Sequence, residues 1–126
     1  MAASPPMPIA TAPDPCPEAV DALVRSLAEY LEPAQVALAR RAYEVGATAH
    51  AGQTRRSGEA YITHPVAVAT ILAELRLDVE TVCAAILHDA LEDTALDPRV
   101  IVEEFGATVS ELVDGVTKLD KLHFRD

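Results

Sequence analysis

The chain has 126 residues, half of them hydrophobic, with 20 acidic against 10 basic residues and a formal net charge of −10. This length suits one domain, the hydrophobic share excludes a wholly disordered acidic chain, and the acidic excess argues against binding to DNA or RNA. No apolar run approaches the roughly 18 to 20 residues that cross a membrane, so we expect no membrane partner.

Residues 1–17 contain six of the nine prolines and a single charged residue, Asp14. Proline removes a backbone donor and biases its predecessor away from helix, so we expect a disordered, proline-rich leader over residues 1–17. The two cysteines, Cys16 and Cys83, lie among prolines and in an apolar run, respectively. We expect both to stay reduced and, because no signal-peptide pattern is present, expect a cytoplasmic protein.

Apolar residues recur at spacings of three and four from Glu18 onward, which predicts a first helix that ends before Pro33. Pro33 then opens a second helix that reaches toward Ala51, since proline is tolerated in a first turn. The stretch 52–59 has no apolar side chain and predicts a loop. Pro65 follows it and predicts the start of a third helix.

Three further helices are predicted in the second half of the chain. Asp78 is a plausible N-cap for the fourth helix, and Asp97, which a proline follows, repeats this signal for the fifth. The fifth helix is expected to end near Gly106, and the sixth begins at Ala107 or Thr108. Six helices without an alternating strand pattern predict an all-α fold with short connections.

Ionisable residues gather near the end of the predicted fourth helix. His88 and Glu92 lie one turn apart, as do Asp89 and Asp93. Charged groups beside a buried segment are costly unless they are paired or bind a metal, and imidazole with carboxylate suits Mn²⁺, Fe²⁺ or Zn²⁺. His64 enters the preceding helix, so antiparallel packing would bring it beside this group. Simple pairing on the helix surface, and a capping role for His64, are the alternatives.

The polar loop carries two guanidinium groups and a hydroxyl, on Arg55, Arg56 and Ser57. Guanidinium groups match phosphate oxygens with two parallel hydrogen bonds. In so acidic a chain this local positive charge is an exception. We interpret the loop as a clamp for an anionic ligand placed over a metal, with a merely solvated loop as the alternative.

Three segments of the sequence together resemble a known family. Residues 49–65, residues 87–94 and residues 103–119 resemble the N-terminal part of the HD hydrolase domain of the RelA/SpoT (Rel) enzymes, which make and destroy the alarmone (p)ppGpp. The resemblance implies an HD-type helical bundle. It also implies metal-dependent removal of the 3′-pyrophosphate from (p)ppGpp, giving GDP or GTP, with a bound Mn²⁺.

The same resemblance assigns a role to each candidate residue. The positions that match metal ligands are His64, His88 and Asp89. The acidic pair that activates water or assists proton transfer is matched by Glu92 and Asp93. The loop that contacts the nucleotide is matched by Arg55, Arg56 and Ser57.

The family's fourth metal ligand is an aspartate in a stretch resembling Leu-Ala-Asp-Arg-Leu-His-Asn, which residues 1–126 do not contain. We therefore interpret residues 18–126 as an incomplete HD hydrolase domain, truncated before its last helices, and leave open whether this chain alone is an enzyme. One alternative is a non-catalytic helical fragment that binds a nucleotide or a partner. Another is a different HD-superfamily nucleotide phosphohydrolase, against which the arginine loop argues.

We expect the 126-residue chain to bind Mn²⁺ weakly and to hydrolyse (p)ppGpp slowly or not at all. Three protein ligands leave the remaining metal positions to water, and one negative charge that would offset the dication is missing. A manganese titration combined with pyrophosphate release from ppGpp measures both properties. Turnover near that of a complete domain would contradict this expectation.

Overall fold

The computed structural model describes residues 16–123, with side chains described as far as Lys118. Most of the predicted leader, residues 1–15, lies outside the described residues. Within the described part the chain forms six helices, α1 (Pro17–Ala28), α2 (Pro33–Ala49), α3 (Thr63–Glu74), α4 (Val79–Asp93), α5 (Pro98–Phe105) and α6 (Ala107–His123). The all-α expectation is confirmed. None of the described helices is long and apolar enough to cross a membrane.

Two helix ends differ from the sequence-based expectation. α1 ends at Ala28, before Leu31, because the N–H groups of Glu29 and Tyr30 donate to carbonyls three residues back and the chain turns. α3 begins at Thr63, two residues before Pro65, since a proline within a first turn removes no helical hydrogen bond. This early start places the residue before Pro65, a histidine, inside the helix.

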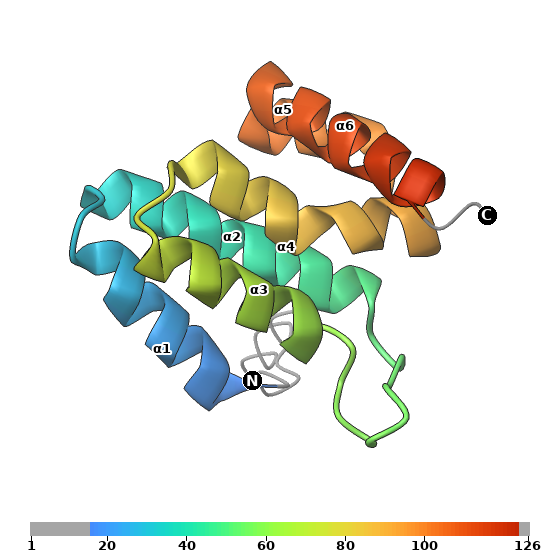
Figure 1. The fold of residues 1–126 in the computed structure, drawn as a ribbon, viewed down its shortest axis with the longest axis horizontal. Helices are drawn as coiled ribbons and strands as arrows, with labels where there is room; N and C mark the ends of the chain where they lie inside the picture. Colours follow the sequence, from blue (N-terminus) through green and yellow to red (C-terminus); the bar gives the residue numbers. More distant parts are fainter. Residues whose placement is uncertain (1–15, 124–126) are drawn as a thin grey trace, which may run out of the picture.

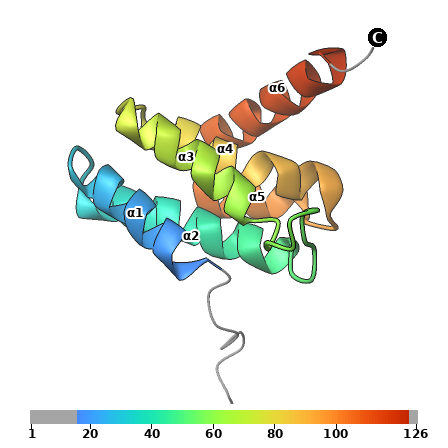
Figure 2. The ribbon, with the colours of Figure 1, turned by 60° about the horizontal axis from the view of Figure 1, so that its bottom comes forward.

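α4 is the central helix of the described structure. It packs against α2, α3, α5 and α6, whereas α1 packs against α2 and α3. Figure 1 and Figure 2 show α5 and α6 on the side of α4 that faces away from α1. The buried residues of α4 are Val79, Val82, Cys83, Ala84, Ile86, Leu87 and Ala90. Because so much of this helix is covered, its side chains have little freedom to move.

α2 approaches α4 closely at Gly46. A Cβ atom at this position would lie 3.0 Å from Cδ1 of Ile62 and 3.6 Å from Cγ2 of Ile86. Protein interiors are packed at crystal-like density, so a side chain here would displace its neighbours. The glycine thus lets α2, α4 and the residue that precedes α3 meet at one point of the core.

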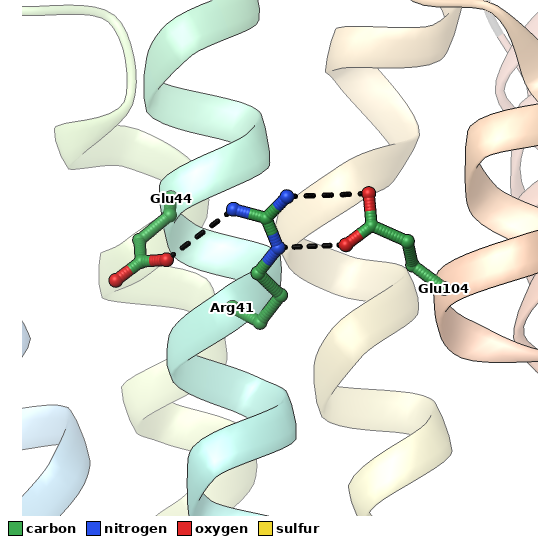
Figure 3. A network of polar contacts seen from close by, with 3 residues as sticks. All are labelled: Arg41, Glu44 and Glu104. Carbon is green, nitrogen blue, oxygen red and sulfur yellow. Dashed lines mark hydrogen bonds and ion pairs between the residues drawn. The ribbon is translucent and has the colours of Figure 1, made fainter. Parts of the chain in front are cut away.

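A bidentate ion pair joins α2 to α5, as Figure 3 shows. Arg41 Nε and Nη2 donate to the two carboxylate oxygens of Glu104 at 2.7 and 3.3 Å, and Nη1 donates to Glu44 at 3.4 Å. The Arg41 side chain is 49% exposed, and such pairs contribute at most about 1 kcal/mol. The burial of Ile101 and Phe105 therefore does more than the ion pair to hold α5 in place.

The predicted N-cap of α4 is present. Asp78 Oδ2 accepts a hydrogen bond from the Thr81 N–H at 3.2 Å, and Oδ1 accepts one from the Thr81 hydroxyl at 2.8 Å. These hydrogen bonds hold the pKa of Asp78 below its usual value. The cap fixes the point where the central helix begins and thereby the register of the residues at its other end.

Asp78→Ala is expected to lower the free energy of unfolding by about 1 kcal/mol, because α4 loses its N-cap acceptor. Chemical denaturation of the variant and the wild type at neutral pH measures this. The control is Asp21→Ala, at an exposed carboxylate of α1, which should change stability by less than about 0.5 kcal/mol.

The same comparison has a defined pH dependence. The folded-state pKa of Asp78 is lowered, so its stabilising contribution is complete above the unfolded-state pKa and is lost as pH falls through the folded pKa. The stability difference between wild type and Asp78→Ala should therefore narrow in acid. A difference that stays constant down to the lowest pH at which the chain folds would contradict the charged cap.

Candidate metal centre

The residues predicted as metal ligands lie on two neighbouring helices. His64 lies in the first turn of α3, whereas His88 and Asp89 lie in the C-terminal half of α4. α3 and α4 pack against each other, and the charge of His64 lowers the pKa of Asp89. The structure thus brings both predicted motifs into one region, as the spacing of the histidines predicted.

The ring of His88 has a defined orientation. Its Nδ1 lies 3.1 Å from the carbonyl oxygen of Ala85, and a carbonyl can only accept, so Nδ1 carries the proton and donates. Its Nε2 lies 3.0 Å from Asp89 Oδ1. A histidine that ligates a metal through one ring nitrogen usually donates its other N–H to a carbonyl or carboxylate in this way. His88 is therefore oriented with Nε2 available to share a cation with Asp89.

Asp89 stays ionised although its side chain is only 14% exposed. The hydrogen bond with His88 does most to lower the pKa of Asp89, and burial opposes it by raising the pKa. The charge of His88, the Tyr61 hydroxyl and the charge of His64 lower the pKa further, so the net shift is downward. The carboxylate is thus in the deprotonated form that metal binding requires.

Tyr61 is a site residue that the sequence reasoning missed. Its hydroxyl donates to Asp89 Oδ2 at 3.1 Å, and its ring meets the ring of His64 edge-on with 6.4 Å between centroids. Burial, followed by the charge of Asp89, raises the pKa of Tyr61 to about 12, so the phenol remains a hydrogen-bond donor at neutral pH. The signal in the sequence was its place, a tyrosine three residues before a candidate ligand in a polar loop.

His50 supports this arrangement from the end of α2. Its side chain is buried, its Nδ1 lies 2.9 Å from Gln53 Oε1, and its ring lies 4.6 Å from that of Tyr61. Its Nε2 is buried and has no hydrogen-bond partner. The structure confirms the interpretation of His50 as a residue that packs and bonds the loop rather than a ligand.

The donor chemistry of the site fits a divalent metal, although a complete ligand shell is not present. Among the described side chains, residues 16–118, no three His, Cys, Asp or Glu residues form a group that could hold a metal ion. The 3.0 Å between His88 Nε2 and Asp89 Oδ1 is about the spacing of two ligands that meet one ion at right angles with bonds of about 2.1 Å. These two donors therefore fit, and the participation of His64 stays a prediction.

The predicted acidic pair lies at the exposed end of α4. Glu92 and Asp93 occupy its last turn, one helical turn beyond His88 and Asp89, respectively. The charge of Asp93 raises the pKa of Tyr61, so this carboxylate acts on the same region as the candidate ligands. The role of the pair in proton transfer stays a prediction.

The loop between α2 and α3 is ordered by its own backbone. The Arg55 N–H donates to the Glu59 carbonyl and the Gly58 N–H to the Arg55 carbonyl, both at 2.8 Å. Gly58 has a φ of +90°, which favours glycine, and the Ser57 hydroxyl donates to Glu59 Oε1 at 3.2 Å. These contacts make a tight turn that projects from one end of the bundle (Figure 1).

The two arginines of this loop are exposed to solvent. The charge of Arg55 lowers the pKa of Tyr61, opposing the effect of the two aspartates, so its guanidinium acts on the region of the candidate ligands. Arg56 and Ser57 lie in the same turn and are exposed as well. The predicted anion-binding loop is therefore next to the predicted metal ligands in space, and its binding role stays a prediction.

Comparison with known proteins connects this arrangement to a family. The model of the HD-domain family matches residues 42–125. The chain is 56% identical over 106 residues to a guanosine-3′,5′-bis(diphosphate) 3′-pyrophosphohydrolase of Vibrio cholerae, and 55% identical over 106 residues to the bifunctional (p)ppGpp synthase/hydrolase SpoT of Escherichia coli K12. It is also 50% identical over 103 residues to a probable GTP pyrophosphokinase of Mycobacterium leprae.

These alignments include most of this chain but little of each relative. The Vibrio and Escherichia alignments cover 84% of this chain and 15% of the relative, and the Mycobacterium alignment covers 82% and 13%. The aligned part holds the polar loop and both groups of candidate ligands. The chain belongs to the HD-domain family, within the group formed by the RelA/SpoT (p)ppGpp enzymes.

Proposed function

We propose that this site removes the 3′-pyrophosphate of (p)ppGpp with the help of a bound divalent metal ion. The observation that carries the proposal is the His88–Asp89 pair. One ring nitrogen of His88 is held by the Ala85 carbonyl, and the other faces an ionised carboxylate oxygen at 3.0 Å. Such a pair, on the helix that carries the HD motif, is suited to hold a cation between imidazole and carboxylate.

His64, His88 and Asp89 would hold the ion, for which Mn²⁺ is our proposal. The ion lowers the pKa of a bound water and polarises a phosphoryl oxygen. In the reaction, water attacks the phosphorus bonded to the 3′ oxygen, the ester bond breaks, and pyrophosphate leaves. Glu92 and Asp93 are suited to accept the proton of the attacking water, since carboxylates close to the ligands can act as general bases.

Arg55, Arg56 and Ser57 would bind the phosphates of the nucleotide. Their turn is exposed, and the charge of Arg55 acts on the same tyrosine as the charges of Asp89 and Asp93. Arginine neutralises phosphate charge and holds it in a fixed orientation. The substrate therefore has a cationic contact beside the metal, although the chain as a whole carries a net charge of −10.

We also propose that the protein works in the cytoplasm. Both described cysteines, Cys16 and Cys83, are free thiols, as expected in a reducing compartment. Burial raises the pKa of Cys83 to about 12, which keeps its thiol protonated and unreactive.

Asp89→Asn is expected to weaken Mn²⁺ binding by at least about 100-fold, because it removes an anionic ligand and not just a supporting group. Isothermal titration with Mn²⁺ measures the affinity, and pyrophosphate release from ppGpp, against dGTP and GMP, measures the activity. Asp21→Asn makes the same chemical change at an exposed position of α1 and should match the wild type. Equal Mn²⁺ affinity in Asp89→Asn and the wild type would exclude Asp89 as a ligand.

Arg56→Gln is expected to weaken ppGpp binding about 10-fold, since a hydrogen bond to a charged group contributes about 1.5–3 kcal/mol. Stability should change little, because Arg56 is exposed. Binding of ppGpp and GDP in the presence of Mn²⁺ gives the affinities, and the exposed Arg25→Gln on α1 is the control. If both variants lose affinity equally, the loop has no specific role and the effect is one of net charge.

A further inference from the structure

Tyr61 lies between the two motifs of the candidate metal centre and reaches both. Its hydroxyl donates to Asp89 Oδ2 at 3.1 Å, on α4. Its ring meets that of His64 edge-on, in the first turn of α3, with 6.4 Å between the centroids. One side chain from the loop thus touches a predicted ligand of one helix and lies against a predicted ligand of the other.

The two oxygens of the Asp89 carboxylate have separate partners. Oδ1 lies 3.0 Å from His88 Nε2, and Oδ2 accepts the hydrogen bond of Tyr61. The terminal torsion of an aspartate is broad, so a carboxylate held at one oxygen can rotate. Held at both oxygens, it keeps Oδ1 at the distance from His88 Nε2 that suits two ligands of one ion.

Tyr61 is itself held in place from α2. Its ring packs against the buried ring of His50 at 4.6 Å, with an angle of 35° between the ring planes. His50 Nδ1 lies 2.9 Å from Gln53 Oε1, and the Tyr61 N–H donates to the Gln53 carbonyl at 2.9 Å. The phenol is therefore rigidly supported, which a positioning group needs if it is to hold a ligand.

We propose that Tyr61 is a positioning residue of the metal centre, whose hydroxyl fixes Asp89 so that Oδ1 and His88 Nε2 face one cation together. This inference rests on the proposed function, because it assigns Tyr61 a role toward the ion that Asp89 and His88 would hold. Supporting partners of metal ligands typically change affinity by 10–100-fold when they are removed.

The test compares Tyr61→Phe with Tyr30→Phe. Each variant loses one hydroxyl that donates a hydrogen bond in a partly buried setting, to Asp89 in the first case and to the Leu77 carbonyl at 2.7 Å in the second. Phenylalanine keeps the ring, so packing against His50 and His64 is retained. Denaturation curves of both variants establish that any difference in metal binding is not a difference in folding.

Mn²⁺ affinity of the 126-residue chain is measured from the paramagnetic resonance signal of free Mn²⁺. Tyr61→Phe is expected to raise the dissociation constant about 10-fold, and Tyr30→Phe to leave it within about twofold of the wild type. Visible absorption of bound Co²⁺ gives a second readout, since it reports ligand geometry. It should change in Tyr61→Phe and stay unchanged in Tyr30→Phe, a difference that a general loss of stability would not produce.

Two results would overturn the proposal, and they are distinguishable. If the wild-type chain binds neither Mn²⁺ nor Co²⁺, the metal centre of the proposed function is wrong, and the role of Tyr61 is excluded along with it. If the wild type binds Mn²⁺ while Tyr61→Phe has the same dissociation constant and the same Co²⁺ spectrum, the metal centre stands and the role of Tyr61 alone is wrong.

Discussion

The burial of α4 is the constraint on which the rest of the structure depends. This helix packs against four others, and hydrophobic side chains line it from Val79 to Ala90. His88 and Asp89 occupy the same buried helix, with side chains only 18% and 14% exposed. Charged groups in such surroundings lose hydration and are tolerated only with partners. Each has partners here, namely the Ala85 carbonyl, the facing side chain and the Tyr61 hydroxyl.

The starts of the helices could be predicted from the sequence because local chemistry determines them. Asp78 and Asp97 accept hydrogen bonds from the first turns of α4 and α5, and these need no distant partner. The end of α1 could not be predicted in this way. Leu31 continues the apolar spacing of α1 yet follows the turn at Tyr30, whose hydroxyl bonds the Leu77 carbonyl far along the chain. A tertiary contact accompanies the turn where the local pattern predicted helix.

The candidate site divides along the same line. The spacing of His64, His88 and Asp89 sufficed to predict that α3 and α4 would bring them into one region. The part played by Tyr61 could not be predicted, because it depends on how the polar loop folds back toward α4, which is a matter of distances between elements. His50 was predictable as a packing residue, since it lies among alanines at the end of α2, but its contact with the Tyr61 ring was not.

The acidic composition and the anionic ligand are compatible once the charges are placed in space. Asp89 and Asp93 raise the pKa of Tyr61 and Arg55 lowers it, so carboxylates and a guanidinium act on one side chain. A cation would be attracted by the carboxylates, and a phosphate by the arginine. With both present, each ligand neutralises charge that would otherwise repel the other. The net charge of −10 therefore says little about the ligand, because what counts is the few charges around Tyr61.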